Sequence, residues 1–108
     1  MVFQLLRRIL QISAIVTAIA VPAAAGAVTQ GPLTIAAVGS HGPTGYVTFT
    51  TPLAESCMWN NVYFSVNDYA GQATLSILMT AHVAGRPLTR IDYAKDAQGM
   101  CWITLAQI

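Results

Sequence analysis

The chain has 108 residues, of which 55% are hydrophobic and only 8% are charged, and its formal net charge is +1. So sparse and balanced a set of charges argues against a nucleic-acid-binding protein, because phosphate binding requires clustered Lys and Arg. It also argues against electrostatic docking on anionic lipid.

Residues 1–27 have the plan of a cleavable export signal. Arg7 and Arg8 form a positive start, an apolar stretch follows, and small residues then predict cleavage after Ala25 or Ala27. A transmembrane anchor is the competing interpretation, but the apolar stretch is shorter than the roughly 20 residues that a bilayer span needs. We therefore expect a secreted or periplasmic protein that has no membrane contact after cleavage.

The rest of the chain, residues 28–108, is long enough for one small domain with a modest core. Its charged residues nearly cancel, at a formal charge of −1: Arg86, Arg90 and Lys95 against Glu55, Asp68, Asp92 and Asp96. A surface with so few charges would favour association if the protein were a monomer. This composition predicts that part of the surface is buried in a homo-oligomer.

The chain contains two cysteines, Cys57 and Cys101, both behind the predicted export signal. In an oxidising compartment, a lone pair of cysteines is most simply explained as one disulfide. In the loop-closure model such a bond removes on the order of 4 kcal/mol of unfolded-state entropy. A redox-active pair is the alternative, but such pairs usually have the C-x-x-C spacing, which this chain lacks.

Five strands and one helix are predicted in chain order. Alternating and β-branched residues predict strands at 33–39, 46–51, 57–66, 88–94 and 100–108. A turn rich in Gly and Pro separates the first two strands. The helix is predicted over 69–84, between an N-cap signal at Asn67-Asp68 and a stop at Gly85. Its buried stripe is expected to hold Ala73, Ile77, Ala81 and Ala84, with Leu75 and Leu78 beside it.

The order of three strands, one helix and two strands predicts a mainly β fold. It is the order of an OB-fold, a five-stranded barrel whose helix lies between strands three and four. The alternative is an open α+β sandwich built from the same elements.

Four short segments resemble a known family: Ser56-Cys57, Gly85-Arg86-Pro87 at the end of the helix, Ile91-Asp92-Tyr93 in the next strand, and a closing Cys101. In this order they resemble the small secreted bacterial proteins related to the subtilase cytotoxin B subunit, over residues 54–105. The resemblance implies an OB-fold with one disulfide, to which Cys57 and Cys101 correspond. For the toxin members it also implies a ring of five identical subunits that binds sialylated glycans and carries a catalytic A subunit.

Three residues are candidates for ligand binding. By the resemblance, Tyr93 matches an aromatic position near the sugar pocket, and Ser40 lies in the first-hairpin region where the family has a sugar-contacting serine. Trp59 is a further candidate from the residues themselves, because it precedes Asn60-Asn61 in an irregular polar stretch. The other aromatic residues, Tyr46, Tyr63 and Trp102, are expected at packing or subunit-interface positions.

No catalytic residue, metal site or cofactor is predicted. His41 and His82 have no third ligand near them in the sequence, and a metal needs three or four. The acidic residues form no carboxylate pair at a spacing suited to acid–base catalysis. The residues favour a secreted or periplasmic, non-enzymatic binding module that resembles a toxin B subunit, and the resemblance implies that it binds a glycan. The alternative is a periplasmic structural or protein-interaction domain with no sugar binding.

Overall fold

A computed structural model describes residues 26–108, so the predicted export signal lies almost wholly outside the described residues. The described part is mainly β, with six strands in one mixed sheet and one long helix. The elements are β1 (Val28–Gln30), β2 (Ile35–His41), β3 (Thr44–Phe49), the short 3-10 helix η1 (Met58–Asn60), β4 (Asn61–Ser65), α2 (Tyr69–Ala84), β5 (Arg90–Lys95) and β6 (Cys101–Gln107). No described helix is long and apolar enough to span a bilayer.

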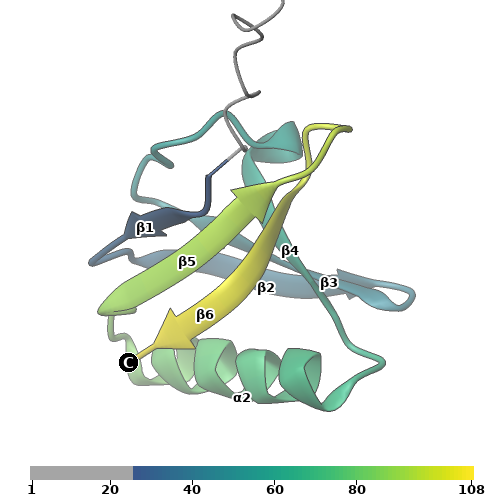
Figure 1. The fold of residues 1–108 in the computed structure, drawn as a ribbon. Helices are drawn as coiled ribbons and strands as arrows, with labels where there is room; N and C mark the ends of the chain where they lie inside the picture. The colour runs from purple at the N-terminus through teal and green to yellow at the C-terminus, as the bar shows by residue number, and fades with distance from the viewer. Residues whose placement is uncertain (1–25) are drawn as a thin grey trace, which may run out of the picture.

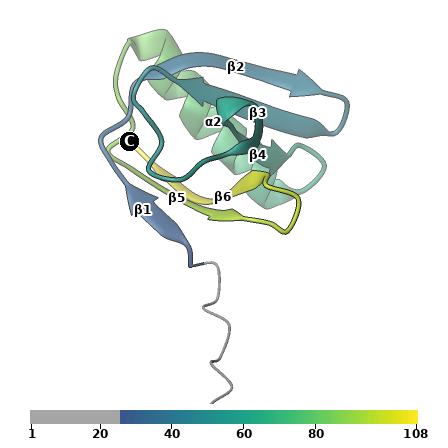
Figure 2. The ribbon, with the colours of Figure 1, turned by 90° about the horizontal axis from the view of Figure 1, so that it is seen from above.

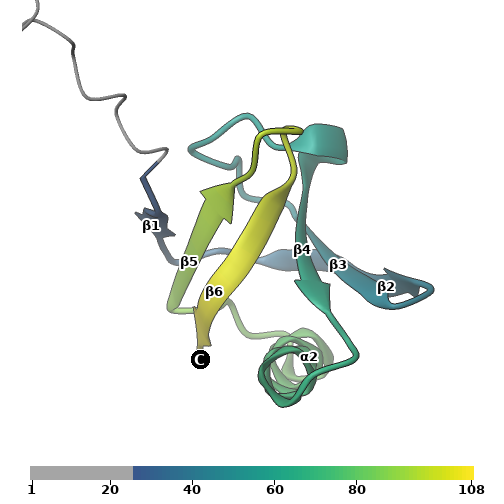
Figure 3. The same cartoon turned by 45° about the vertical axis from the view of Figure 1, so that its right-hand side comes forward.

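The strands follow the order β1-β5-β6-β4-β3-β2. All neighbours are antiparallel except β4 and β6, which run parallel and pair only at Val62–Cys101 and Tyr63–Trp102. The sheet bends so that β2 and β3 lie opposite β5 and β6, with α2 across one end (Figures 1 and 2). Figure 3 shows α2 nearly end-on beneath this bent sheet.

Within residues 26–108 the sheet does not close into a complete barrel, because the end strands β1 and β2 do not pair with each other. The arrangement is consistent with the alternative prediction of an open α+β sheet. One isolated antiparallel bridge nevertheless connects the two sides. Leu33, just before β2, and Leu88, just before β5, donate their backbone N–H groups to each other's carbonyl oxygens at 2.9 and 2.8 Å.

The core lies between the bent sheet and α2, which contacts β2, β4 and β6. Its central side chains are completely buried: Leu33, Val47, Val62, Leu78, Leu88, Ile91, Tyr93 and Cys101. Cys101 is bonded to Cys57, so the predicted disulfide is confirmed in the structure. The bond joins the loop before β4 to the start of β6, at the end of the sheet opposite α2.

The helix prediction is confirmed at both ends. Asp68 is the N-cap, and its side chain accepts a hydrogen bond from the Gly71 N–H at 2.6 Å. Gly85 ends the helix with φ +65°, a left-handed conformation that glycine adopts at little cost. The predicted buried stripe is wrong in part, because Ala73 and Ala84 are exposed.

The helix is rotated relative to that prediction. Its buried residues are Gly71, Leu78 and Ala81, and Leu75 and Ile77 pack beside them against the core. A Cβ on Gly71 would overlap the backbone carbonyl oxygen of Ser65. The helix therefore approaches the end of β4 through its glycine, and this close approach sets which face is buried.

The strand predictions need two corrections. The sequence did not indicate β1, which has only three residues and pairs with β5 through Val28 and Tyr93. The predicted strand over 57–66 is also too long. Trp59 and Asn60 have positive φ values of 58° and 54°, so the chain turns through η1 before β4 begins at Asn61.

Candidate functional site

The structure does not bring the three predicted ligand-binding residues together. Ser40 is exposed on β2 beside the hairpin turn, where it pairs with Gly45. Trp59 precedes Asn61, which pairs with Thr48 at the other end of β3. Gly45 and Thr48 are three residues apart on β3, so Ser40 and the segment that holds Trp59 lie roughly 10 Å apart along the strand.

Tyr93 is fully buried in the core, so its ring offers no surface to a ligand. Its hydroxyl donates a hydrogen bond to Gln30 Oε1 at 3.0 Å and accepts one from the Glu55 N–H at 3.2 Å. Gln30 in turn accepts from the Ala54 N–H and donates to the Pro52 carbonyl oxygen. Tyr93 and Gln30 together hold the loop that leads to the disulfide.

Trp59 has the geometry of an exposed contact residue, with 80% of its surface accessible. Several bonds fix its backbone: Cys57 is in the disulfide, the Met58 N–H donates to the Gly99 carbonyl oxygen at 2.8 Å, and the Asn60 N–H donates to the Cys57 carbonyl oxygen at 3.0 Å. The ring is therefore presented on a rigid turn. The described pockets are lined by other residues.

A row of aromatic side chains crosses the sheet on the face away from the core. Strand pairing aligns Gly39 with Tyr46, Tyr46 with Tyr63, and Tyr63 with Trp102. Their strand neighbours Val47, Val62 and Cys101 belong to the core cluster, and alternation along each strand places the aromatic residues on the opposite face. At Gly39 a Cβ would lie 2.5 Å from the Tyr46 ring, so that ring lies directly over the glycine.

Trp102 ends this row at the place where β4 and β6 diverge. Its indole N–H donates to Asp96 Oδ2 at 2.9 Å, and its ring centroid lies 6.0 Å from that of Tyr63. The other oxygen of Asp96 accepts from the backbone N–H groups of Gln98 and Met100, each at 2.9 Å. The bond from Trp102 is the main reason that the pKa of Asp96 lies below its ordinary value, and burial opposes it.

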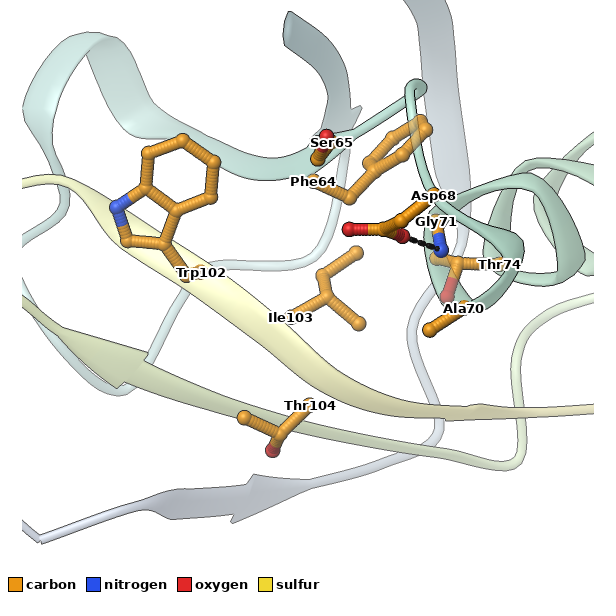
Figure 4. Close-up of a pocket in the computed structure, with 9 residues that line it drawn as sticks. All are labelled: Phe64, Ser65, Asp68, Ala70, Gly71, Thr74, Trp102, Ile103 and Thr104. Atoms are coloured by element: carbon orange, nitrogen blue, oxygen red, sulfur yellow. Dashed lines mark hydrogen bonds between the residues drawn. The ribbon is translucent and has the colours of Figure 1, made fainter.

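A pocket of about 240 Å³ opens beside Trp102, between the diverging strands and the first turns of α2 (Figure 4). Phe64 and Ile103 contribute apolar side chains from β4 and β6. The polar side chains around them come from three elements, and the full lining is Phe64, Ser65, Asp68, Ala70, Gly71, Thr74, Trp102, Ile103 and Thr104.

Asp68 is the one charged residue of this lining. Its Oδ1 is the helix cap, and its other carboxylate oxygen points into the pocket in Figure 4. Ser65, Thr74 and Thr104 add three hydroxyl groups, each of which can donate and accept a hydrogen bond. An aromatic ring beside hydroxyl groups and one carboxylate is an arrangement suited to a small polyhydroxylated ligand.

Sequence reasoning assigned Trp102 to packing and so missed this site. The pocket depends on the parallel pairing of β4 with β6, two segments about 40 residues apart, which no local pattern indicates. One signal was present: the predicted disulfide between Cys57 and Cys101 implies that these two segments are neighbours.

No group of three or more potential metal ligands occurs among the residues that the structure describes.

Comparisons with protein-family models, with curated proteins and with solved structures found no match to this chain.

Proposed function

We propose that this protein is a secreted or periplasmic, non-enzymatic binding module that holds a glycan at the Trp102 pocket. The pocket carries the proposal, because it combines a half-buried aromatic ring with hydroxyl groups and a carboxylate from three separate elements. Its volume of about 240 Å³ lies below the range of about 300–1,000 Å³ usual for drug-sized ligands, so it suits a single sugar ring.

We further propose that the fold is a variant of the OB-fold. Three features support this: the order of the strands and helix, the parallel pairing of β4 with β6, and the Leu33–Leu88 bridge between the two sides of the sheet. These features agree with the resemblance to subtilase cytotoxin B subunits, although that resemblance placed the sugar-contacting residues Ser40 and Tyr93 elsewhere.

A binding role is proposed in preference to catalysis because, within the part of the chain that the structure describes, Asp68 is the sole titratable side chain lining the pocket. That carboxylate is already engaged as the cap of α2. General acid–base chemistry usually needs a second group within hydrogen-bond reach of the same substrate atom. The disulfide and the predicted export signal support a location outside the cytoplasm.

A glycan array probed with the disulfide-bonded protein tests the proposed function. We expect binding to at least one class of glycan, and we expect Trp102→Ala to abolish it while Trp59→Ala leaves it unchanged. An array with no binding to any sugar would exclude the lectin part of the proposal. Far-ultraviolet circular dichroism and thermal unfolding of each variant check that the fold is kept.

A protein-interaction role, with or without self-association, is the second candidate. The observation that favours it is the exposure of large side chains outside the pocket: Trp59 at 80%, Tyr69 at 92% and Val83 at 80%. The resemblance implies a ring of five copies, in which such residues would be covered. Native mass spectrometry of the mature protein tests this: a pentamer supports the toxin-like assembly, and a strict monomer removes it.

A further inference from the structure

We infer that the Trp102 pocket selects a neutral pyranose ring and rejects sugars that carry a carboxylate, including the sialic acids that the family resemblance implies. The inference rests on the proposed function and names the ligand class of the same site. The reason is the charge of the pocket, which comes from Asp68 alone.

Among residues 26–108, no basic side chain lines the pocket to balance this charge. Arg86 follows the far end of α2, about 24 Å from Asp68 for a helix of 16 residues. Arg90 is paired with Asp92 at 2.8 Å, and Lys95 lies 3.7 Å from Glu55.

His41 is the nearest potential cation by strand register. It pairs with Thr44, which pairs with Ser65 at the pocket rim, so two strand spacings, roughly 10 Å, separate His41 from the rim. A negatively charged ligand would therefore meet the Asp68 carboxylate without a compensating cation.

The same groups suit a neutral sugar. The free oxygen of Asp68 accepts a hydrogen bond from a sugar hydroxyl, and a hydrogen bond to a charged acceptor is stronger than one between neutral groups. Ser65, Thr74 and Thr104 carry hydroxyl groups at the edge of the pocket, although the Thr104 hydroxyl points away from Asp68 in Figure 4, and the Trp102 ring forms an apolar part of the lining.

The platform is already fixed before any ligand arrives. Trp102 is held by Asp96 on one side and by Tyr63 on the other, and Asp96 is itself held by two backbone N–H groups. Binding to a fixed ring avoids the entropic cost of ordering a side chain.

The chain offers a clean reporter for a test. It contains two tryptophans, so Trp59→Phe leaves Trp102 as the sole source of indole fluorescence. The ligands are matched pairs, glucose with glucuronic acid and galactose with galacturonic acid, which differ at C6 where a hydroxymethyl group replaces a carboxylate. N-acetylneuraminic acid represents the sialic acids, and tetramethylammonium tests whether the pocket is a cation site.

We expect at least one neutral sugar to change the Trp102 fluorescence, and its uronic acid partner to bind about tenfold more weakly, because the sugar carboxylate would lie beside the Asp68 carboxylate. The variant Asp68→Asn keeps the cap, because Asn is as good an N-cap as Asp. In this variant the affinities for the neutral sugar and its uronic acid partner should differ by less than about threefold. The substitution leaves Trp102 and its contacts with Asp96 and Tyr63 unchanged.

The outcomes separate the inference from the proposed function. Equal or tighter binding of the acidic sugar at Trp102, or preferential binding of tetramethylammonium, overturns the neutral-sugar inference but leaves a binding module. Sugar binding that persists in Trp102→Ala and disappears in Trp59→Ala moves the site elsewhere and overturns the inference. No binding of any sugar to the folded protein overturns both.

Discussion

The ring of Trp102 on β6 lies 6.0 Å from the ring of Tyr63 on β4, centroid to centroid, with an angle of 48° between the ring planes. This tilted contact spans the parallel strand pair, and one residue further along each strand the two strands have diverged. Because aromatic pairs prefer offset or tilted geometries at this spacing, the contact stabilises the strand pair at the edge of the pocket. Trp102 is therefore both the last residue of β6 that pairs with β4 and part of the lining of the candidate binding site.

The Tyr93→Phe variant tests whether Tyr93 has a structural role. It removes the hydroxyl that joins Gln30 to the Glu55 N–H, and the loss of these two partly buried hydrogen bonds, at about 0.5–1.5 kcal/mol each, costs about 1–3 kcal/mol. We expect a loss of unfolding free energy in this range, measured by urea denaturation, and faster amide exchange at Glu55. Sugar binding should be unchanged; a loss of binding with stability intact would instead place Tyr93 at a ligand site.

The Gly71→Ala variant tests the close approach of α2 to β4. A Cβ would overlap the Ser65 carbonyl oxygen, so the helix must shift, and we expect a loss of more than about 2 kcal/mol despite the better helix propensity of Ala. Gly85→Ala is the matched control. There the Cβ meets open space and the cost is about 1 kcal/mol for the left-handed backbone. Equal effects of the two substitutions would contradict the tight packing at Gly71.

The disulfide closes a loop across a sequence separation of 44 residues. Its removal in the double variant Cys57→Ser, Cys101→Ser should lower the unfolding free energy by about 2–5 kcal/mol, the range found for small secreted domains in general. Denaturant unfolding with and without a reductant measures the same quantity in the native chain. Identical midpoints in both conditions would show that the bond contributes nothing to stability.

Acid should weaken the protein through Asp96. The pKa of this carboxyl is held below its ordinary value, first by the Trp102 indole N–H and then by backbone donors. The stabilisation is therefore present above the ordinary carboxyl pKa of about 4 and is lost as the pH falls through the lower pKa of the folded state. At pH 6 the unfolding free energy of the native protein should exceed that of Asp96→Asn, and the two values should converge at acid pH. A gap that stays constant with pH would exclude this linkage.

Asp92 adds a second acid-sensitive contact. Its pKa is also lowered, chiefly by the hydrogen bond from Arg90, whose guanidinium contacts both carboxylate oxygens at 3.0 and 2.8 Å. The sign is the same, so protonation of Asp92 in acid removes stabilisation from the folded state. The difference in unfolding free energy between Asp92→Asn and the native protein should accordingly become smaller as the pH falls through the acid range. A difference that grows instead would contradict the lowered pKa of Asp92.

The sequence by itself determined the ends of α2, the disulfide and the mainly β content, but not β1, η1 or the buried face of the helix. The α2 boundaries follow from an N-cap at Asp68 and a glycine at position 85, since capping chemistry lies within a few residues of the helix end. The cysteine pairing follows from there being two cysteines behind a predicted export signal. The mainly β content follows from the alternation of apolar and polar residues along each predicted strand.

Only the tertiary structure decided where the candidate site lies. Tyr93 and Trp102 are similar aromatic residues on neighbouring strands, yet one is in the core and the other beside a pocket. The difference arises because Tyr93 faces the core, whereas Trp102 lies on the other face of the sheet, where β6 stops pairing with β4 beside α2. Contacts between segments so distant along the chain depend on packing and register, and a single sequence read along its own length does not contain them.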